Sequence, residues 1–197
     1  MKAGTRLQIR ILALLAALSV GLCPAGGVCD PGADELRRVK AAFVLNIARF
    51  VAWPADAFAG NADALHLCLY RSNPLGSAIE TIRGKKVGKR SLSVSTIRDI
   101  GRGRECQILF VPPAELGRFA GGPPSATQPI LTLTDATSDD AAARRRDNAV
   151  MVTLVRNGTR IGFEIDLPRV RRAGLRMSAE LLKLARIVGD SSGGDAR

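Results

Sequence analysis

The chain has 197 residues, a formal net charge of +11 and a hydrophobic fraction of 46%. This length and composition favour one domain with a substantial buried core and leave little room for two. Aromatic residues make up only 4% of the chain, and its Lys and Arg residues are scattered, which argues against a nucleic-acid partner. We therefore interpret the basic charge as a solvated surface.

Residues 1–25 have the pattern of a secretory signal peptide. Their positive start comprises Lys2, Arg6 and Arg10. The uncharged apolar run that follows, residues 11–22, has the length of a signal-peptide core and falls short of the roughly 20 apolar residues that span a bilayer. Small residues then offer a cleavage site, most simply after Ala25 or Gly27. We expect a cleaved signal peptide at 1–25 and a periplasmic mature protein.

The mature chain is expected to be one domain that does not span the membrane. Removal of residues 1–25 takes away three of the 29 Lys and Arg residues and none of the 18 Asp and Glu residues, which leaves a net charge of +8. No second apolar run reaches the length of a transmembrane helix. We divide the remainder into a short linker at 26–34, an α/β domain at 35–188 and a polar tail at 189–197.

The clearest expected helix covers residues 34–53. Its apolar residues recur at steps of three and four, so they form one broad stripe. Pro54 disfavours helical geometry at the residue before it and ends the helix. The elements expected next are a buried strand at 65–70, a short helix at 73–82, a half-exposed strand at 91–95, a buried strand at 106–111, a short helix at 114–119 and a third apolar strand at 129–134.

The C-terminal third begins with a polar surface helix expected at 139–146. Residues 150–155 and 159–165 alternate around Asn157-Gly158, a strong signal for a β-hairpin. Ser178 caps a last helix. The side chains expected to bury one face of that helix are Leu181, Leu182, Leu184, Ala185 and Ile187. Together these elements predict an α/β fold, a single three-layer domain with a partly parallel central sheet flanked by helices and an antiparallel C-terminal hairpin.

Two of the four cysteines lie well inside the expected domain. Cys23 leaves with the signal peptide, and the fate of Cys29 depends on the cleavage point. Cys68 and Cys106 each lie in an apolar, strand-like run, and in an oxidising compartment they are candidates for a disulfide. Two buried free thiols are the alternative. The sole histidine, His66, lies two residues from Cys68 without another soft ligand nearby in sequence, so no metal site is expected.

Catalytic residues are not expected. A Ser-His-Asp or Cys-His device would have to use His66, which lies in an expected strand and suits a structural role better. The sequence contains no phosphate-binding glycine motif and no nucleophile elbow. Asp135, at the carboxyl end of an expected parallel strand, is either a ligand group or, more simply, a turn-forming residue. We expect neither enzyme activity nor a cofactor.

Two polar residues of the first helix suggest a ligand pocket. Asn46 and Arg49 lie among apolar residues, and with Trp53 they are candidates to line a small cavity. An Arg beside an aromatic ring suits an acidic or planar ligand. The alternative is a boundary arginine whose stem packs while its head reaches water.

Several segments resemble the YfiR-like family of periplasmic proteins. The matching segments are Lys-Ala-Ala-Phe at 40–43 with Asn46, Phe50, Trp53 and Pro54; Cys68; Asn-Pro-Leu-Gly at 73–76; Gly84-Lys85; 106–110; Ile-Leu-Thr at 130–132 with Asp135; 163–167; 171–178; and 181–185. They span about residues 35 to 188. Their order and spacing make the resemblance specific, although no single motif decides it.

The resemblance implies a regulator without enzyme activity. Its relatives are dimeric α/β proteins that bind the periplasmic part of an inner-membrane diguanylate cyclase and hold it inactive, which lowers cyclic di-GMP and biofilm formation. The resemblance also implies the Cys68–Cys106 disulfide. A second disulfide of some relatives has no cysteines here, and Asn148-Ala149-Val150 replaces a glycine-rich entry to the hairpin. A small-ligand or cell-wall-binding protein is the alternative function.

Overall fold

The computed structural model describes residues 31–60, 62–120, 128–138 and 150–189. The expected signal peptide, most of the linker, the surface helix expected at 139–146 and all but the first residue of the tail lie outside these ranges. None of the helices described is both long and apolar enough to cross a bilayer.

The first helix, α2, covers Pro31–Arg49. The expectation that it continues to Trp53 is wrong, because the chain turns extended at Val51. Strand β1 (Val51–Ala52) pairs antiparallel with β9 (Arg176–Met177), and Phe50 accepts a backbone hydrogen bond from Ser178. A pairing with residues 124 and 126 positions away in the sequence therefore ends the helix before Pro54 takes effect.

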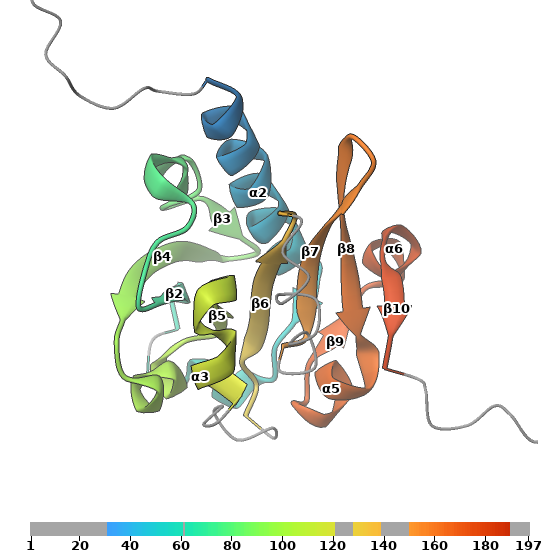
Figure 1. Ribbon diagram of the computed structural model, residues 1–197. Helices are drawn as coiled ribbons and strands as arrows, with labels where there is room; N and C mark the ends of the chain where they lie inside the picture. Colours follow the sequence, from blue (N-terminus) through green and yellow to red (C-terminus); the bar gives the residue numbers. More distant parts are fainter. Residues whose placement is uncertain (1–30, 61, 121–127, 139–149, 190–197) are drawn as a thin grey trace, which may run out of the picture. The chain divides into compact units, whose positions relative to one another are not determined.

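Within the described residues, eight strands form one mixed sheet in the order β10-β8-β7-β6-β5-β2-β4-β3, and Figure 1 shows β10 to β5 of this order from right to left. Their bounds are β2 Ala64–Tyr70, β3 Lys86–Val87, β4 Arg90–Ile97, β5 Ile108–Phe110, β6 Leu131–Ala136, β7 Val152–Asn157, β8 Arg160–Asp166 and β10 Arg186–Val188. The pairs around β2, β5 and β6 are parallel, and β7–β8 and β3–β4 are antiparallel. The predicted α/β class with a partly parallel sheet is confirmed.

The hairpin expected around Asn157-Gly158 is also confirmed. Asn157 pairs with Arg160 at its tip, and Gly158 has a φ of +60°. This left-handed conformation costs a glycine little and disfavours other residues, which explains the turn signal in the sequence.

Short helices complete the layers. They are the 3₁₀-helices η1 Ala55–Phe58, η2 Gly76–Thr81, η3 Ile100–Glu105 and η4 Pro113–Glu115, and the α-helices α3 Leu116–Ala120, α5 Leu167–Arg172 and α6 Ala179–Leu184. The side chains of β2 alternate between two buried clusters, as a strand covered on both faces requires. Leu67 belongs to the cluster under α2 and η2, whereas Cys68 belongs to the cluster under α3.

The C-terminal helix α6 is shorter than expected. Its predicted cap is present, because the Ser178 hydroxyl accepts a hydrogen bond from the Leu181 backbone N–H at 3.2 Å. The chain becomes extended at Ala185 and continues as β10, which pairs parallel with β8. The expectation of one continuous buried face is therefore wrong. Leu181 is buried, but Leu184 and Ile187 are exposed.

Candidate functional site

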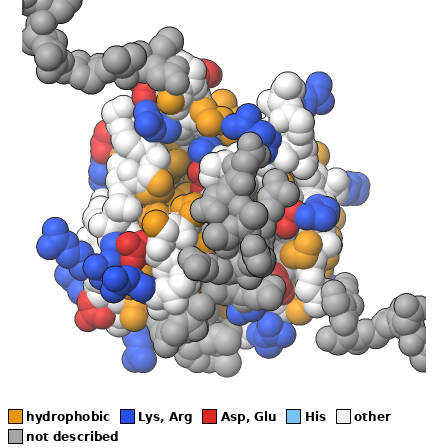
Figure 2. All heavy atoms as spheres, in the orientation of Figure 1, with side chains coloured by type: hydrophobic (Ala, Val, Ile, Leu, Met, Phe, Trp, Pro, Cys, Tyr) orange, Lys and Arg blue, Asp and Glu red, His pale blue; other side chains and the backbone are white. Residues whose placement is uncertain are grey.

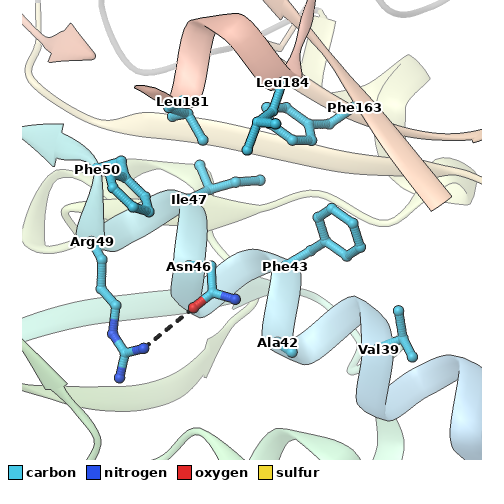
Figure 3. Close-up of a pocket in the computed structure, with 10 residues that line it drawn as sticks. All are labelled: Val39, Ala42, Phe43, Asn46, Ile47, Arg49, Phe50, Phe163, Leu181 and Leu184. Carbon is cyan, nitrogen blue, oxygen red and sulfur yellow. Dashed lines mark hydrogen bonds between the residues drawn. The ribbon is translucent and has the colours of Figure 1, made fainter. Parts of the chain in front are cut away.

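An open groove of about 540 Å³ lies beside α2, with α6 and β8 contributing to its walls. Its lining residues are Val39, Ala42, Phe43, Asn46, Ile47, Arg49, Phe50, Phe163, Leu181 and Leu184. Figure 3 shows the α2 residues on one wall, with Leu181, Leu184 and Phe163 opposite them. The Phe43 and Phe163 rings meet edge to face with centroids 6.0 Å apart. The groove is apolar along most of its length.

Its polar edge comprises Asn46 and Arg49. The Arg49 guanidinium donates from Nη1 to Asn46 Oδ1 and from Nε to the Lys86 carbonyl, each at 3.3 Å. The second bond links the end of α2 to the edge strand β3. Both side chains are exposed, so the guanidinium is held at the groove edge while it stays accessible to a ligand.

Trp53, the third predicted pocket residue, is not among the lining residues of the groove. Its indole N–H donates to the Gln107 carbonyl at 3.2 Å, and its ring packs edge to face on Phe58. The Gln107 side chain in turn donates to the Ala57 carbonyl and accepts from the His66 backbone N–H. Trp53 thus fastens η1 to the sheet. The structure brings Asn46 and Arg49 together and places Trp53 elsewhere, because α2 ends at Arg49.

Exposed apolar side chains extend the groove. The large hydrophobic residues exposed among the described positions are Phe50 (43%), Leu184 (74%) and Ile187 (39%). Phe50 and Leu184 line the groove, and Ile187 follows three residues later in β10. Helical periodicity predicted a buried face that includes Leu184 and Ile187, so these exposed residues could not be recognised from the sequence. Ile187 lies beyond α6 because β10 pairs with the distant strand β8, whereas Leu184 is the last residue of α6 and is exposed there.

Charged groups on α6 flank the apolar residues. Glu180 and Lys183 are both exposed. Hydrogen bonds from the Glu180 backbone N–H and then from Ser178 lower the pKa of the Glu180 carboxyl. Together, Glu180 and Lys183 place one charge of each sign on α6.

The Cys68–Cys106 disulfide is present in the structure, with the two Cα atoms 5.9 Å apart. Both residues are buried, at 3% and 2% exposure. The bond joins β2 to the segment just before β5, on the face that α3 covers. It lies on the opposite side of the sheet from the cluster under α2, so it is not part of the groove.

Asp135 is engaged in internal contacts. Its Oδ2 accepts a 2.6 Å hydrogen bond from Lys40 Nζ, and its Oδ1 accepts from the Thr137 backbone and hydroxyl. The Lys40 and Asp135 side chains are only 12% and 14% exposed. These contacts are those of the turn-forming alternative, with an added ion pair that fixes α2 to the end of β6.

A second hollow, of about 490 Å³, is more polar and lies around Asp56, His66, Arg104 and Glu105. No group of three or more His, Cys, Asp or Glu residues within the described ranges is arranged to hold a metal ion. On the face drawn in Figure 2, Lys and Arg side chains lie in several separate groups. That distribution agrees with the interpretation of the charge as a solvated surface.

The structure combines an α/β fold with an open, largely apolar groove beside α2. The sequence profile of the YfiR/HmsC-like family matches residues 37–186, which is well over half of the chain. The protein belongs to this family, and the resemblance stated from the sequence is confirmed. At the family level it is a periplasmic regulator of diguanylate cyclase, in a regulatory and non-catalytic family. No curated protein matches the chain.

Proposed function

We propose that the mature chain binds the periplasmic sensor part of an inner-membrane diguanylate cyclase and inhibits it, which lowers cyclic di-GMP. The observation that carries this proposal is the family match over residues 37–186, because it covers almost the entire described domain. The protein acts by contact alone, without a cofactor or chemical step. Envelope stress, or redox stress that acts elsewhere than on the buried Cys68–Cys106 bridge, releases the cyclase from it.

Export is the first requirement of this proposal. Residues 1–25 direct the chain to the periplasm and are then cleaved, and residues 35–188 fold there as one domain. The buried Cys68–Cys106 bridge supports an oxidising compartment, since disulfides persist there and are rare in the cytosol. N-terminal sequencing of the exported protein tests this step, and we expect the mature chain to start shortly after Ala25 or Gly27.

Deletion of the gene tests the regulatory role. We expect cyclic di-GMP and biofilm mass to rise in the deletion strain and to return to the wild-type level when the full chain is supplied from a plasmid. A chain without residues 1–25 should not restore repression, because it stays on the wrong side of the membrane. Unchanged cyclic di-GMP after deletion, in a strain that contains a membrane-bound diguanylate cyclase with a periplasmic sensor, would contradict the proposal.

A homodimer is proposed on family grounds. Light scattering on the purified mature chain measures the mass in solution. Twice the chain mass is expected, and the single chain mass would contradict this part of the proposal.

A second candidate function is binding of a small periplasmic ligand or cell-wall fragment in the pocket proposed around Asn46, Arg49 and Trp53. The groove favours it, because its volume is in the range of small-molecule sites and Arg49 offers a charge at one edge. Thermal unfolding with a panel of acidic and planar envelope compounds tests it. A stabilising compound should lose its effect on Arg49→Ala, and the effect of Trp53→Phe shows whether Trp53 takes part.

A further inference from the structure

We propose that the α2–α6 groove is the docking surface for an acidic amphipathic helix of about three turns in the periplasmic part of the cyclase. This inference rests on the proposed function. It adds the contact surface and the kind of segment that binds there. The argument uses the exposed apolar side chains, their spacing along α2 and the charge at the groove edge.

Two of the three large apolar side chains that are exposed within the described residues line the groove. They are Phe50 and Leu184, and the third, Ile187, follows Leu184 by three residues in β10. Leu184 is the most exposed of the three and makes little contribution to the core. A group of large exposed hydrophobic residues marks an interaction site more often than an isolated one does. Contacts with a partner would remove these side chains from water.

The shape of the groove suits a helix. Val39, Phe43, Asn46 and Phe50 lie on one stripe of α2 at steps of four, three and four residues, and α6 stands opposite. A third helix can pack its side-chain ridges between two such helices. From Val39 to Phe50, which directly follows the last residue of α2, the stripe spans eleven steps, which corresponds to about 16 Å at 1.5 Å per residue. A partner helix of about three turns would therefore fill it.

Charge decides between an acidic partner and a second copy of this chain. Arg49 is the charged residue that lines the groove, and its guanidinium geometry suits a carboxylate. The mature chain has a net charge of +8, so two copies facing each other here would bring like charges and two Arg49 side chains together. A partner helix with Asp or Glu opposite Arg49 avoids this repulsion. A homodimer would therefore use another face of the domain.

The first test measures cyclic di-GMP in the deletion strain carrying full-length variants. Leu184→Asp places a charge in the apolar contact without disturbing the core, and we expect binding to weaken at least about tenfold and repression to fail. Arg49→Glu should weaken repression by a smaller factor, and Arg49→Lys should fall between Arg49→Glu and the wild type, because it keeps the charge but loses the planar guanidinium. Lys89→Asp, an exposed change next to the opposite edge of the sheet, is the matched control and should repress like the wild type.

The second test identifies what touches the groove. The photo-crosslinking residue p-benzoylphenylalanine is introduced in place of Leu184 in the exported full chain, and cells are irradiated. Mass spectrometry should identify a crosslinked peptide from the periplasmic part of a diguanylate cyclase. That peptide should have apolar residues at steps of three and four and at least one Asp or Glu. Crosslinks that join only two copies of this chain would overturn the assignment.

The outcomes separate the docking surface from the proposed function. If deletion raises cyclic di-GMP and folded Leu184→Asp still represses fully, the function stands and the docking surface is wrong. If deletion changes nothing, the function fails and the docking inference fails with it. If a small acidic compound binds the groove and Leu184→Asp keeps repression, the groove is a ligand site. Circular dichroism and thermal unfolding confirm that each variant is folded.

Discussion

The two faces of the sheet differ in how completely their apolar side chains are shielded from water. On the α3 face, a buried disulfide closes the cluster around Cys68, Leu109 and Phe119. On the α2 face, the larger cluster is well buried at its centre, but the edge between α2 and α6 is left open to water. Exposed hydrophobic residues at this edge do little for the stability of the isolated chain.

This difference suggests a division of roles within one domain. The closed face holds the fold together in the periplasm, and the open edge keeps apolar surface available for a partner. Changes on the closed side should then lower the free energy of unfolding and spare repression in molecules that remain folded. Changes at the open edge should weaken repression and leave the free energy of unfolding almost unchanged. The following variants test that comparison, from the largest expected loss of stability to the smallest.

Removal of the disulfide should have the largest effect on stability. Cys68→Ala combined with Cys106→Ala opens a loop that spans 38 positions, for which the chain-entropy model predicts a loss of about 4 kcal/mol. Urea unfolding of the purified mature protein measures it. At a temperature where the variant is still folded, it should repress the cyclase normally.

The wild-type protein provides the control for the disulfide. Mass spectrometry of the native protein should show no free thiol at Cys68 or Cys106, and reduction in denaturant should reproduce the stability of the double variant. Free thiols in protein isolated from the periplasm, or an unchanged urea midpoint in the double variant, would show that the bridge does not stabilise the closed face.

Loss of the Lys40–Asp135 ion pair should come next. Asp135→Asn leaves the Lys40 ammonium with little solvent and without its carboxylate, because the two side chains are only 12% and 14% exposed. We expect a loss of about 3 kcal/mol in the free energy of unfolding. Replacing both residues by apolar ones of similar size should recover much of that loss, since no buried charge is then left unpaired.

An exposed ion pair on the same helix is the matched control. Glu35 and Arg38 lie 3.8 Å apart with side chains that are more than half exposed, so Glu35→Gln should change the free energy of unfolding by less than about 0.5 kcal/mol. Equal effects of Asp135→Asn and Glu35→Gln would mean that burial of the Lys40–Asp135 pair does not matter.

Local signals in the sequence predicted much of this fold. Asn157-Gly158 indicates a turn in which Gly158 adopts a left-handed conformation. The apolar run around Cys68 indicates a buried strand. Ser178 caps a helix through a residue only three positions away. Each depends on residues close in sequence, so each could be found without the structure. The helix ends that were predicted wrongly depend on strand pairing with residues far away in the sequence. Val51 pairs with Met177, and Ile187 pairs beside Ile165.

Those distant pairings also explain how far the site could be predicted. Asn46 and Arg49 were proposed as pocket residues because they are polar residues one turn apart on an apolar helix, and the structure places both at the edge of the groove. Trp53 was assigned to the same pocket only because α2 was expected to reach it. Leu184 and Ile187 looked like core residues because they fit the helical spacing of the apolar residues that begins at Leu181, although α6 ends at Leu184. Their exposure follows from tertiary structure that helical periodicity does not encode.

Removal of the α6 cap should lower the free energy of unfolding by less than loss of the disulfide or of the Lys40–Asp135 ion pair. Ser178→Ala deletes the hydroxyl that accepts from the Leu181 N–H, and we expect a loss of about 1 kcal/mol in the free energy of unfolding. Ser178→Asp should retain most of the stability, because a carboxylate also caps a helix. Since α6 positions Leu184, repression should weaken slightly in Ser178→Ala and not in Ser178→Asp. Equal stability of the two variants would show that the cap is unimportant.

The smallest change in stability is expected at the open edge itself. Ile187→Thr keeps a β-branched side chain on β10, where Ile187 is 39% exposed. We expect the free energy of unfolding to change by less than about 0.5 kcal/mol, with cyclic di-GMP rising about twofold because partner contact is reduced.

Its matched control is the adjacent residue in the sheet. Ile165 is the register partner of Ile187 and is fully buried, so Ile165→Thr should cost about 2 kcal/mol by placing a hydroxyl in the core. It should repress normally where it is folded, because it leaves the exposed apolar surface unchanged. If Ile187→Thr loses stability and Ile165→Thr loses repression instead, the separation between the buried centre of the α2 face and its binding edge is wrong. If both keep repression, the partner contact does not reach β10 and is confined to the groove between α2 and α6.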